Sequence, residues 1–164
     1  TGSHHTTRLC LERLEQYIKP GMEVLDLGCG SGILSSVALL LGAASATAVD
    51  IDPNAAHIAR ENAQRNGIPD DRYRIFAGNV LEDEALIRTI ADRQYDLILA
   101  NIVADVIIAL APTVPPLLKD GGTYITSGII TERGDEVLAA YAKTPLTLQH
   151  TAQSGDWLAF DYQK

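Results

Sequence analysis

The segment that most constrains the fold of this 164-residue chain is 24–34, which reads Val-Leu-Asp-Leu-Gly-Cys-Gly-Ser-Gly-Ile-Leu. Apolar residues lead up to Asp26, and glycines then recur at positions 28, 30 and 32. Glycine suits a backbone that must take a positive φ or let a ligand approach closely. A strand, a glycine-rich turn and a helix N-terminus together form a nucleotide-type binding corner. The stretch 33–41 is apolar on nearly every side, which predicts a buried helix.

The rest of the chain alternates strand and helix patterns. Strands are expected at 23–27, 46–51, 72–77, 95–100, 123–127, 147–151 and 157–162. Helices are expected at 7–18, 32–41, 53–66, 82–93, 103–118 (broken at its prolines) and 131–142. Five strand–helix units closed by a hairpin predict an α/β fold: a doubly wound, mostly parallel seven-stranded sheet with a C-terminal antiparallel hairpin. We expect residues 1–164 to form one domain.

The charge balance and the cysteines narrow the class of protein. Thirteen Lys and Arg against 21 Asp and Glu give a net charge of −8, which repels a phosphate backbone, so direct nucleic-acid binding is not expected. No apolar run approaches the roughly 18 residues that span a bilayer, and the N-terminus lacks a signal-peptide pattern. Cys10 and Cys29 lie far apart and are expected to be reduced, as in a cytoplasmic protein. The four histidines show no metal-binding spacing.

Four features are expected at the carboxyl ends of the strands, where ligands bind in such sheets. They are the glycine turn, Asp50, the turn around Asn79, and Asn101. Asp50 lies 22 residues after Gly28, where a carboxylate can accept hydrogen bonds from both hydroxyls of a ribose. The alternative is that Asp50 and Asp52 only cap the following helix. Asp52 fits that role well because Pro53 begins the helix.

The spacing of the glycines distinguishes between nucleotides. A dinucleotide site would have G-x-G-x-x-G, whereas this turn is G-x-G-x-G and is preceded by Asp26. A carboxylate is unfavourable beside a pyrophosphate, but it suits a ligand that carries an ammonium group, directly or through an oriented water. The methionine end of S-adenosylmethionine has such an ammonium. With the terminal hairpin, this pattern resembles the class I methyltransferases, which implies S-adenosylmethionine as the cofactor.

Flanking motifs make the resemblance narrower. The segments 1–12, 26–34, 49–55, 61–67 and 99–104, with Ser127-Gly-Ile-Ile and Trp157, resemble the bacterial methyltransferases of large-subunit ribosomal protein eleven, the PrmA-like family. By itself the segment Thr1–Thr7 could be a frayed terminus or a tag remnant, but here it matches a family motif that contacts the cofactor. His5 departs from that motif, which often has proline. The resemblance implies these cofactor-binding residues: Thr6, Thr7, Asp26, Gly28, Gly30, Asp50, Ile51, Asn79 and Asn101.

The resemblance also implies an activity. The acceptors would be lysine ε-amines, an N-terminal amine or both, on ribosomal protein eleven. Family members carry a further N-terminal domain that binds this protein, so we expect the present chain to be the catalytic domain alone. A lysine must enter uncharged, and the side-chain oxygen of Asn101 is a possible contact for its amine. No residue emerges as a dedicated base, so the catalytic residues stay unassigned. The alternative for Asn101 is a strand-end residue that caps the next helix.

The sequence is also compatible with three other functions. A nucleic-acid or small-molecule amine methyltransferase would use similar chemistry. The nucleic-acid enzymes resemble one another in an Asn/Asp-Pro-Pro-aromatic motif, whereas this chain has Asn101-Ile-Val-Ala. An NAD-dependent oxidoreductase and a cofactor-binding module without activity are the other two.

Overall fold

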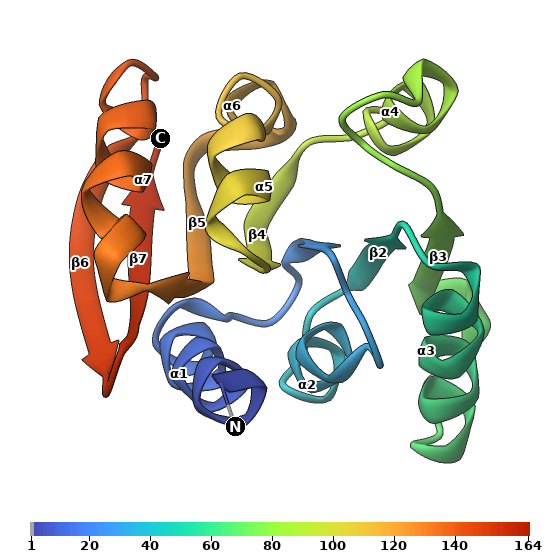
Figure 1. Ribbon diagram of the computed structural model, residues 1–164. Coiled ribbons are helices and arrows are strands. Elements are labelled where there is room, and N and C mark those ends of the chain that lie inside the picture. Colours follow the sequence, from blue (N-terminus) through green and yellow to red (C-terminus); the bar gives the residue numbers. More distant parts are fainter. Residues whose placement is uncertain (1) are drawn as a thin grey trace.

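The computed structural model describes residues 2–164 (Figure 1). Thr1, the first residue of the N-terminal motif, lies outside them. The strands are β1 Glu23–Leu27, β2 Ser45–Asp50, β3 Tyr73–Ala77, β4 Tyr95–Asn101, β5 Leu118–Ile130, β6 Thr147–Ser154 and β7 Trp157–Gln163. The α-helices are α1 Gly2–Tyr17, α2 Ile33–Leu40, α3 Pro53–Arg65, α4 Glu84–Ile90, α5 Ala104–Ala109, α6 Val114–Leu117 and α7 Gly134–Ala142. Short 3-10 turns lie at Asp70–Arg72 and Thr131–Arg133.

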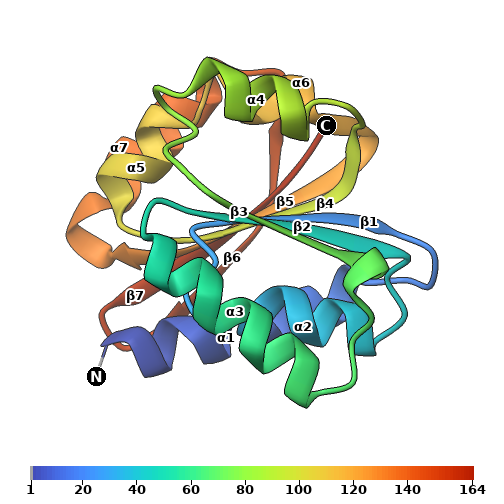
Figure 2. The ribbon, with the colours of Figure 1, turned by 90° about the vertical axis from the view of Figure 1, so that its right-hand side faces the viewer.

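The strands form one seven-stranded sheet in the order β3-β2-β1-β4-β5-β7-β6. Strands β1 to β5 are parallel, and β7 runs antiparallel to both β5 and β6. The doubly wound sheet and its C-terminal antiparallel hairpin are therefore as predicted. From β1 the chain winds first toward β3 and then, through β4, toward β5, so the switch point lies between β1 and β4. Figure 2 shows α1, α2 and α3 on one face of the sheet and α4 to α7 on the other.

Both faces of the sheet are buried, which explains the near-continuous apolar strands. Val24 packs into the core beneath α1 and α2, whereas Leu25 and Leu27 pack into the core on the opposite face. By the same alternation, Asp26 faces the side of α1 and α2, and none of its surface is exposed. This strand therefore carries a carboxylate into the buried face of the sheet beneath α1 and α2.

The ends of several elements differ from the prediction. Helix α1 begins at Gly2 rather than at residue 7, and the side chain of Ser127 donates a hydrogen bond to the carbonyl of Thr6 at 3.0 Å. This contact is tertiary, so helical periodicity alone does not reveal it. Strand β5 extends past 123–127 in both directions because it pairs with β7 as far as Ile130 and because Gly121 and Gly122 bond to Lys164. Pro112 lies between α5 and α6, as expected, whereas Pro115 and Pro116 lie inside the short α6.

The prediction that the helix after the glycine turn is buried was wrong for one side of that helix. In α2, Ile33 is 45% exposed and Leu40 is 62% exposed, whereas Ser35 and Ser36 are buried. A helix packed on one face of a sheet buries only the side that faces the sheet. The packing direction, which composition does not give, therefore decides which residues of α2 are covered.

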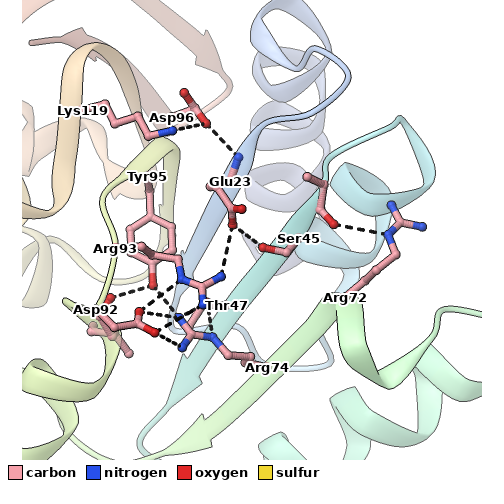
Figure 3. Close-up of polar contacts among 12 residues, drawn as sticks. Glu23, Ser45, Thr47, Arg72, Arg74, Asp92, Arg93, Tyr95, Asp96 and Lys119 are labelled. Atoms are coloured by element: carbon pink, nitrogen blue, oxygen red, sulfur yellow. Dashed lines mark hydrogen bonds and ion pairs between the residues drawn. The ribbon is translucent and has the colours of Figure 1, made fainter.

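A polar network crosses the amino ends of the strands, opposite the end at which ligands bind (Figure 3). Arg74 donates to the buried Thr47 hydroxyl, to the Tyr95 hydroxyl and to the Asp92 carboxylate, over 2.9–3.1 Å. Glu23 bonds to Ser45 and forms an ion pair with Arg93. Arg74 thus joins β2 and β3 to the segment that enters β4.

We expect Arg74→Met to lower the free energy of unfolding by about 1–3 kcal/mol, because the buried Thr47 hydroxyl loses its donor and the Asp92 carboxylate keeps only Arg93. Urea unfolding followed by circular dichroism measures this change. Arg88→Met is the matched control, since Arg88 only meets Glu84 at 4.0 Å on the surface. Its effect should stay below about 0.5 kcal/mol. Equal effects of the two substitutions would show that the network does not brace the sheet.

Candidate functional site

A cavity of about 220 Å³ lies at the carboxyl ends of β1, β2 and β3. Four of the predicted site residues line it: Gly28, Asp50, Ile51 and Asn79. The remaining lining residues are Leu27, Val49, Gly78, Val80, Leu81, Ile102, Val106 and Leu110. The cavity is therefore largely apolar, with one carboxylate at its edge. Ligand sites that accept a flat apolar group with a polar end have this composition.

Asp50 connects the glycine turn to the start of α3. Its Oδ2 accepts a hydrogen bond from the backbone N–H of Gly30 at 2.9 Å, and its Oδ1 accepts one from the N–H of Asp52 at 2.9 Å. The side chain of Asp52, by contrast, caps α3 by accepting from Asn54 at 2.9 Å. Capping is therefore the role of Asp52 alone. Each oxygen of Asp50 keeps a further lone pair that can accept a hydroxyl.

The glycine turn is fixed against β2 and requires its glycines. The N–H groups of Gly28 and Cys29 both donate to the carbonyl of Val49, at 2.8 and 3.0 Å. Gly28 has φ +75°, and a Cβ at this position would overlap the Cγ2 of Ile102. At Gly32, with φ +80°, a Cβ would lie 2.8 Å from the Tyr73 hydroxyl. Side chains are thus excluded on steric as well as conformational grounds.

We expect Gly28→Ala to lower the free energy of unfolding by about 2–4 kcal/mol. The left-handed backbone costs about 1–2 kcal/mol for a residue with a Cβ, and displacement of Ile102 adds to it. A chain of this length should lose roughly 5–15 °C in Tm, measured by calorimetry. Gly30→Ala is the matched control: its φ is +53°, but nothing lies within 4 Å of the added Cβ, so only the conformational cost applies. If the two variants unfolded at the same temperature, the contact with Ile102 would carry no weight.

Asp26 lies below the glycine turn and does not line the cavity. Neither carboxylate oxygen has a well-formed hydrogen bond to a described residue, although the donors of Ser35 lie near enough to lower the pKa of this carboxyl. Burial raises the pKa of this carboxyl from about 3.8 to about 6; the nearby Ser35 opposes the rise, and the negative charge of Asp50 adds to it. A buried acid without such a bond is costly, and such groups concentrate at functional sites. The structure thus provides negative charge here without a cation to balance it.

Thr6, Thr7 and Asn101 come together beside this cavity, at the carboxyl ends of β4 and β5. The Asn101 side-chain N–H donates to the Thr7 hydroxyl at 3.5 Å, so the beginning of α1 lies over the end of β4. Asn101 does not cap α5, whose N-cap is Val103. The Asn101 Oδ1 lies beside Gly128, where a Cβ would come within 3.2 Å of it.

The apolar lining is what the sequence did not reveal. Ile102, Val106 and Leu110 look like ordinary core residues in the sequence, but they form one wall of the cavity. The available signal in the sequence for this wall was that these three residues follow Asn101 in the chain. The side-chain oxygen of Asn79 accepts from the N–H of Leu81 at 3.0 Å, so Asn79 holds the turn that brings Val80 and Leu81 to the cavity.

Other kinds of site find little support in the described residues. Within 2–164, no three His, Cys, Asp or Glu side chains gather as metal ligands. Cys10 and Cys29 are both buried free thiols, and burial raises the pKa of each. In the same range, no helix is long and apolar enough to cross a membrane.

Comparison with known proteins places this geometry in a family. The profile described as "Ribosomal protein L11 methyltransferase (PrmA)" matches residues 1–164. The chain belongs to the ribosomal protein L11 methyltransferase family. The family methyltransferase of Lachnospira eligens is 43% identical over 159 residues, which cover 96% of this chain and 50% of the relative. That of Pseudomonas aeruginosa is 43% identical over 158 residues, which cover 96% of this chain and 50% of the relative.

A solved structure agrees with this family assignment. The ribosomal protein L11 methylase of Lactobacillus delbrueckii subsp. bulgaricus superposes with a TM-score of 0.88 at 31% identity, over 98% of this chain and 79% of that one. The chain spans about half the length of the L11 methyltransferase sequences that it matches. The match therefore covers the whole of this chain but only part of those relatives.

Proposed function

We propose that this chain is the catalytic domain of an S-adenosylmethionine-dependent protein N-methyltransferase. Its substrates would be lysine ε-amines, the N-terminal amine, or both, of ribosomal protein L11 in the cytoplasm. The observation that carries the proposal is the apolar cavity edged by Asp50, at the glycine turn that the buried Asp26 precedes, in a chain of the L11 methyltransferase family. The other half of the relatives' length would then hold the domain that binds L11.

The residues present fit this cofactor. The apolar wall suits an adenine ring, and the two oxygens of Asp50 suit the ribose hydroxyls. Asp26 provides the negative charge that a methionine ammonium needs, and its lack of a well-formed hydrogen bond to a described residue supports that role. When bound, the cofactor supplies a sulfonium-activated methyl group. Of the other predicted contacts, Ile51 lines the cavity, whereas Thr6, Thr7 and Gly30 are assigned from their positions in the family motifs.

The chain's own residues have to align an amine with that methyl group. A lysine amine is protonated near neutral pH, since its pKa is about 10.4, so it must lose its proton before attack. Asn101 has no ionisable group, but its Oδ1 can accept an N–H and so orient the amine for in-line displacement. Thr7 holds the Asn101 amide in place. Orientation, rather than proton transfer, is thus the role that we assign to Asn101.

The surface charge supports a basic protein substrate. The net charge of −8 attracts a lysine-rich partner and repels a nucleic-acid backbone. The sequence at the end of β4, Asn101-Ile-Val-Ala, also lacks the paired prolines expected of the nucleic-acid amine enzymes. Methylation of RNA is therefore the competing result, which the transfer of a labelled methyl group distinguishes from methylation of L11.

A thermal-shift measurement tests the cofactor directly. S-adenosylhomocysteine at about 100 times its Kd should stabilise the chain by about 2.7 kcal/mol, whereas NAD should leave the Tm unchanged. Stabilisation by NAD and not by S-adenosylhomocysteine would favour the oxidoreductase alternative and contradict the proposal.

Transfer of a labelled methyl group tests the substrate. Purified L11 should become labelled on its amines when the enzyme is supplied at the full length of its relatives, and the chain alone shows whether the present segment suffices. Ribosomal RNA serves as the competing acceptor. Label on the RNA and none on L11 would overturn the protein substrate while leaving the cofactor assignment standing.

A further inference from the structure

A second buried carboxylate, Asp161 of β7, binds two side chains of helix α1. Its Oδ2 accepts hydrogen bonds from Arg13 Nε at 2.9 Å, from Arg13 Nη2 at 2.7 Å and from the Tyr17 hydroxyl at 2.8 Å. Asp161 is fully buried, and only 17% of the Arg13 side chain is exposed. These three residues are called the α1 clamp. It joins segments that lie 148 residues apart in the chain.

The clamp shares a face of the sheet with the candidate site. Strand pairing puts Asp26, Leu99, Ile125 and Asp161 in one row across β1, β4, β5 and β7, so all four point to the same face. On α1, Thr6, Arg13 and Tyr17 follow the i, i+7, i+11 spacing of one helix face. The face of α1 that carries the clamp therefore also carries Thr6 toward the ends of the strands.

The beginning of α1 contacts the ends of β4, β5 and β6. The polar contacts there include Ser127 Oγ to the Thr6 carbonyl at 3.0 Å, Asn101 to Thr7 at 3.5 Å, and His5 to Ser154 at 3.4 Å. An α-helix is stiff and rises 1.5 Å per residue, so Arg13 lies only about 10 Å along the axis from Thr6 and Thr7. The position of the clamp contacts therefore determines the position of the first turns of α1.

The construction of the clamp points to positioning rather than to stability alone. All three hydrogen bonds converge on Oδ2, while Oδ1 of Asp161 is buried with no partner in the described chain. A buried ion pair often adds little stability compared with apolar packing, and in some proteins its role is to select one arrangement of the elements that it joins. Arg13 makes this arrangement directional, because its planar guanidinium bonds through two nitrogens.

We propose that Arg13, Tyr17 and Asp161 position α1 so that Thr6 and Thr7 close over Asn101 and Ser127. They act through α1 and do not contact the ligand. The clamp thereby sets cofactor affinity and the orientation of Asn101. This inference rests on the proposed function only in naming the ligand, which is S-adenosylmethionine.

The test uses Tyr17→Phe, which removes one hydrogen bond and no charge, together with Asp161→Asn and Arg13→Lys. The control is Arg8→Met on the same helix, where Arg8 makes only a surface pair with Glu12 at 3.3 Å. Two quantities are measured well below each Tm: the Kd for S-adenosylhomocysteine, and the NMR shifts of the Thr6, Thr7 and Ser127 backbone amides and the Asn101 side-chain amide.

Tyr17→Phe should raise the Kd about threefold and Asp161→Asn about tenfold. The NMR shifts of Thr7 and Asn101 should change in both variants. Arg13→Lys should fall between them, and Arg8→Met should change neither quantity. The proposal is overturned if the Tm falls while the Kd is unchanged and the NMR shift changes are confined to residues near the clamp. The clamp would then contribute to stability alone. If the unaltered chain binds no S-adenosylhomocysteine, the proposed function fails, and the shifts at Thr7 and Asn101 still decide whether the clamp positions α1.

Discussion

Asp50→Ala is expected to weaken S-adenosylhomocysteine binding by about 100-fold or more. Two hydroxyl-to-carboxylate hydrogen bonds are lost, and charged hydrogen bonds contribute about 1.5–3 kcal/mol each. The glycine turn also loses the acceptor of the Gly30 N–H, at 2.9 Å. Because Asp50 lies at the cavity edge and is only half-buried, the chain should still fold. Isothermal titration calorimetry measures the affinity, and circular dichroism checks the fold.

Two further variants separate the parts of this effect. Asp50→Asn keeps the shape but only one acceptor oxygen, so its loss of affinity should be smaller than that of the alanine variant. Asp52→Ala removes only the cap of α3, which costs about 1 kcal/mol of stability. It should leave the Kd within about threefold. Unchanged affinity in Asp50→Ala would remove Asp50 from the site.

Asp26→Asn is expected to stabilise the free chain above pH 6 and to lower its affinity for S-adenosylhomocysteine. The folded pKa of Asp26, about 6, lies above its ordinary value of 3.8, so the folded state binds the extra proton between these values. Stability therefore falls as the pH rises from about 4 to 6 and is level above that. A rise of about two units corresponds to a loss of about 3 kcal/mol.

Asparagine cannot ionise, so the variant should lack this fall in stability. At pH 8 it should exceed the unaltered chain by about 1–3 kcal/mol, since its amide stays buried without a partner. Unfolding in urea at pH 4.5, 6 and 8 measures the difference. The affinity for S-adenosylhomocysteine should drop at least about tenfold, because the negative charge near the ammonium is gone.

An exposed carboxylate provides the control for this pH dependence. Asp70 pairs with Arg60 at 3.4 Å, and its side chain is 69% exposed. Asp70→Asn should leave the pH profile of stability unchanged. The interpretation of Asp26 would be wrong if Asp26→Asn followed the same profile as the unaltered chain, or if it bound the ligand equally well.

The roles of Asp50 and Asp52 show how far sequence reasoning reached in this site. Pro53 predicted Asp52 as the cap, and in the structure Asp52 caps α3. The distance from Gly28 predicted Asp50 as a ligand residue, and in the structure Asp50 lies at the cavity edge. Both inferences rest on local geometry within one strand–helix unit. Asp26 was also singled out from the sequence, but its complete burial was not, because burial depends on α1 and α2 packing over it.

By itself, the sequence determined the order of the elements, the doubly wound sheet and the glycine turn, because periodicity, turn residues and short connections are local. Only the tertiary structure decided which apolar residues face solvent on α2, and that Ile102, Val106 and Leu110 form a cavity wall. It also decided that Arg13 meets Asp161, since β7 reaches α1 only after the sheet is assembled. Such contacts join segments distant in the chain, and no spacing within the sequence encodes them.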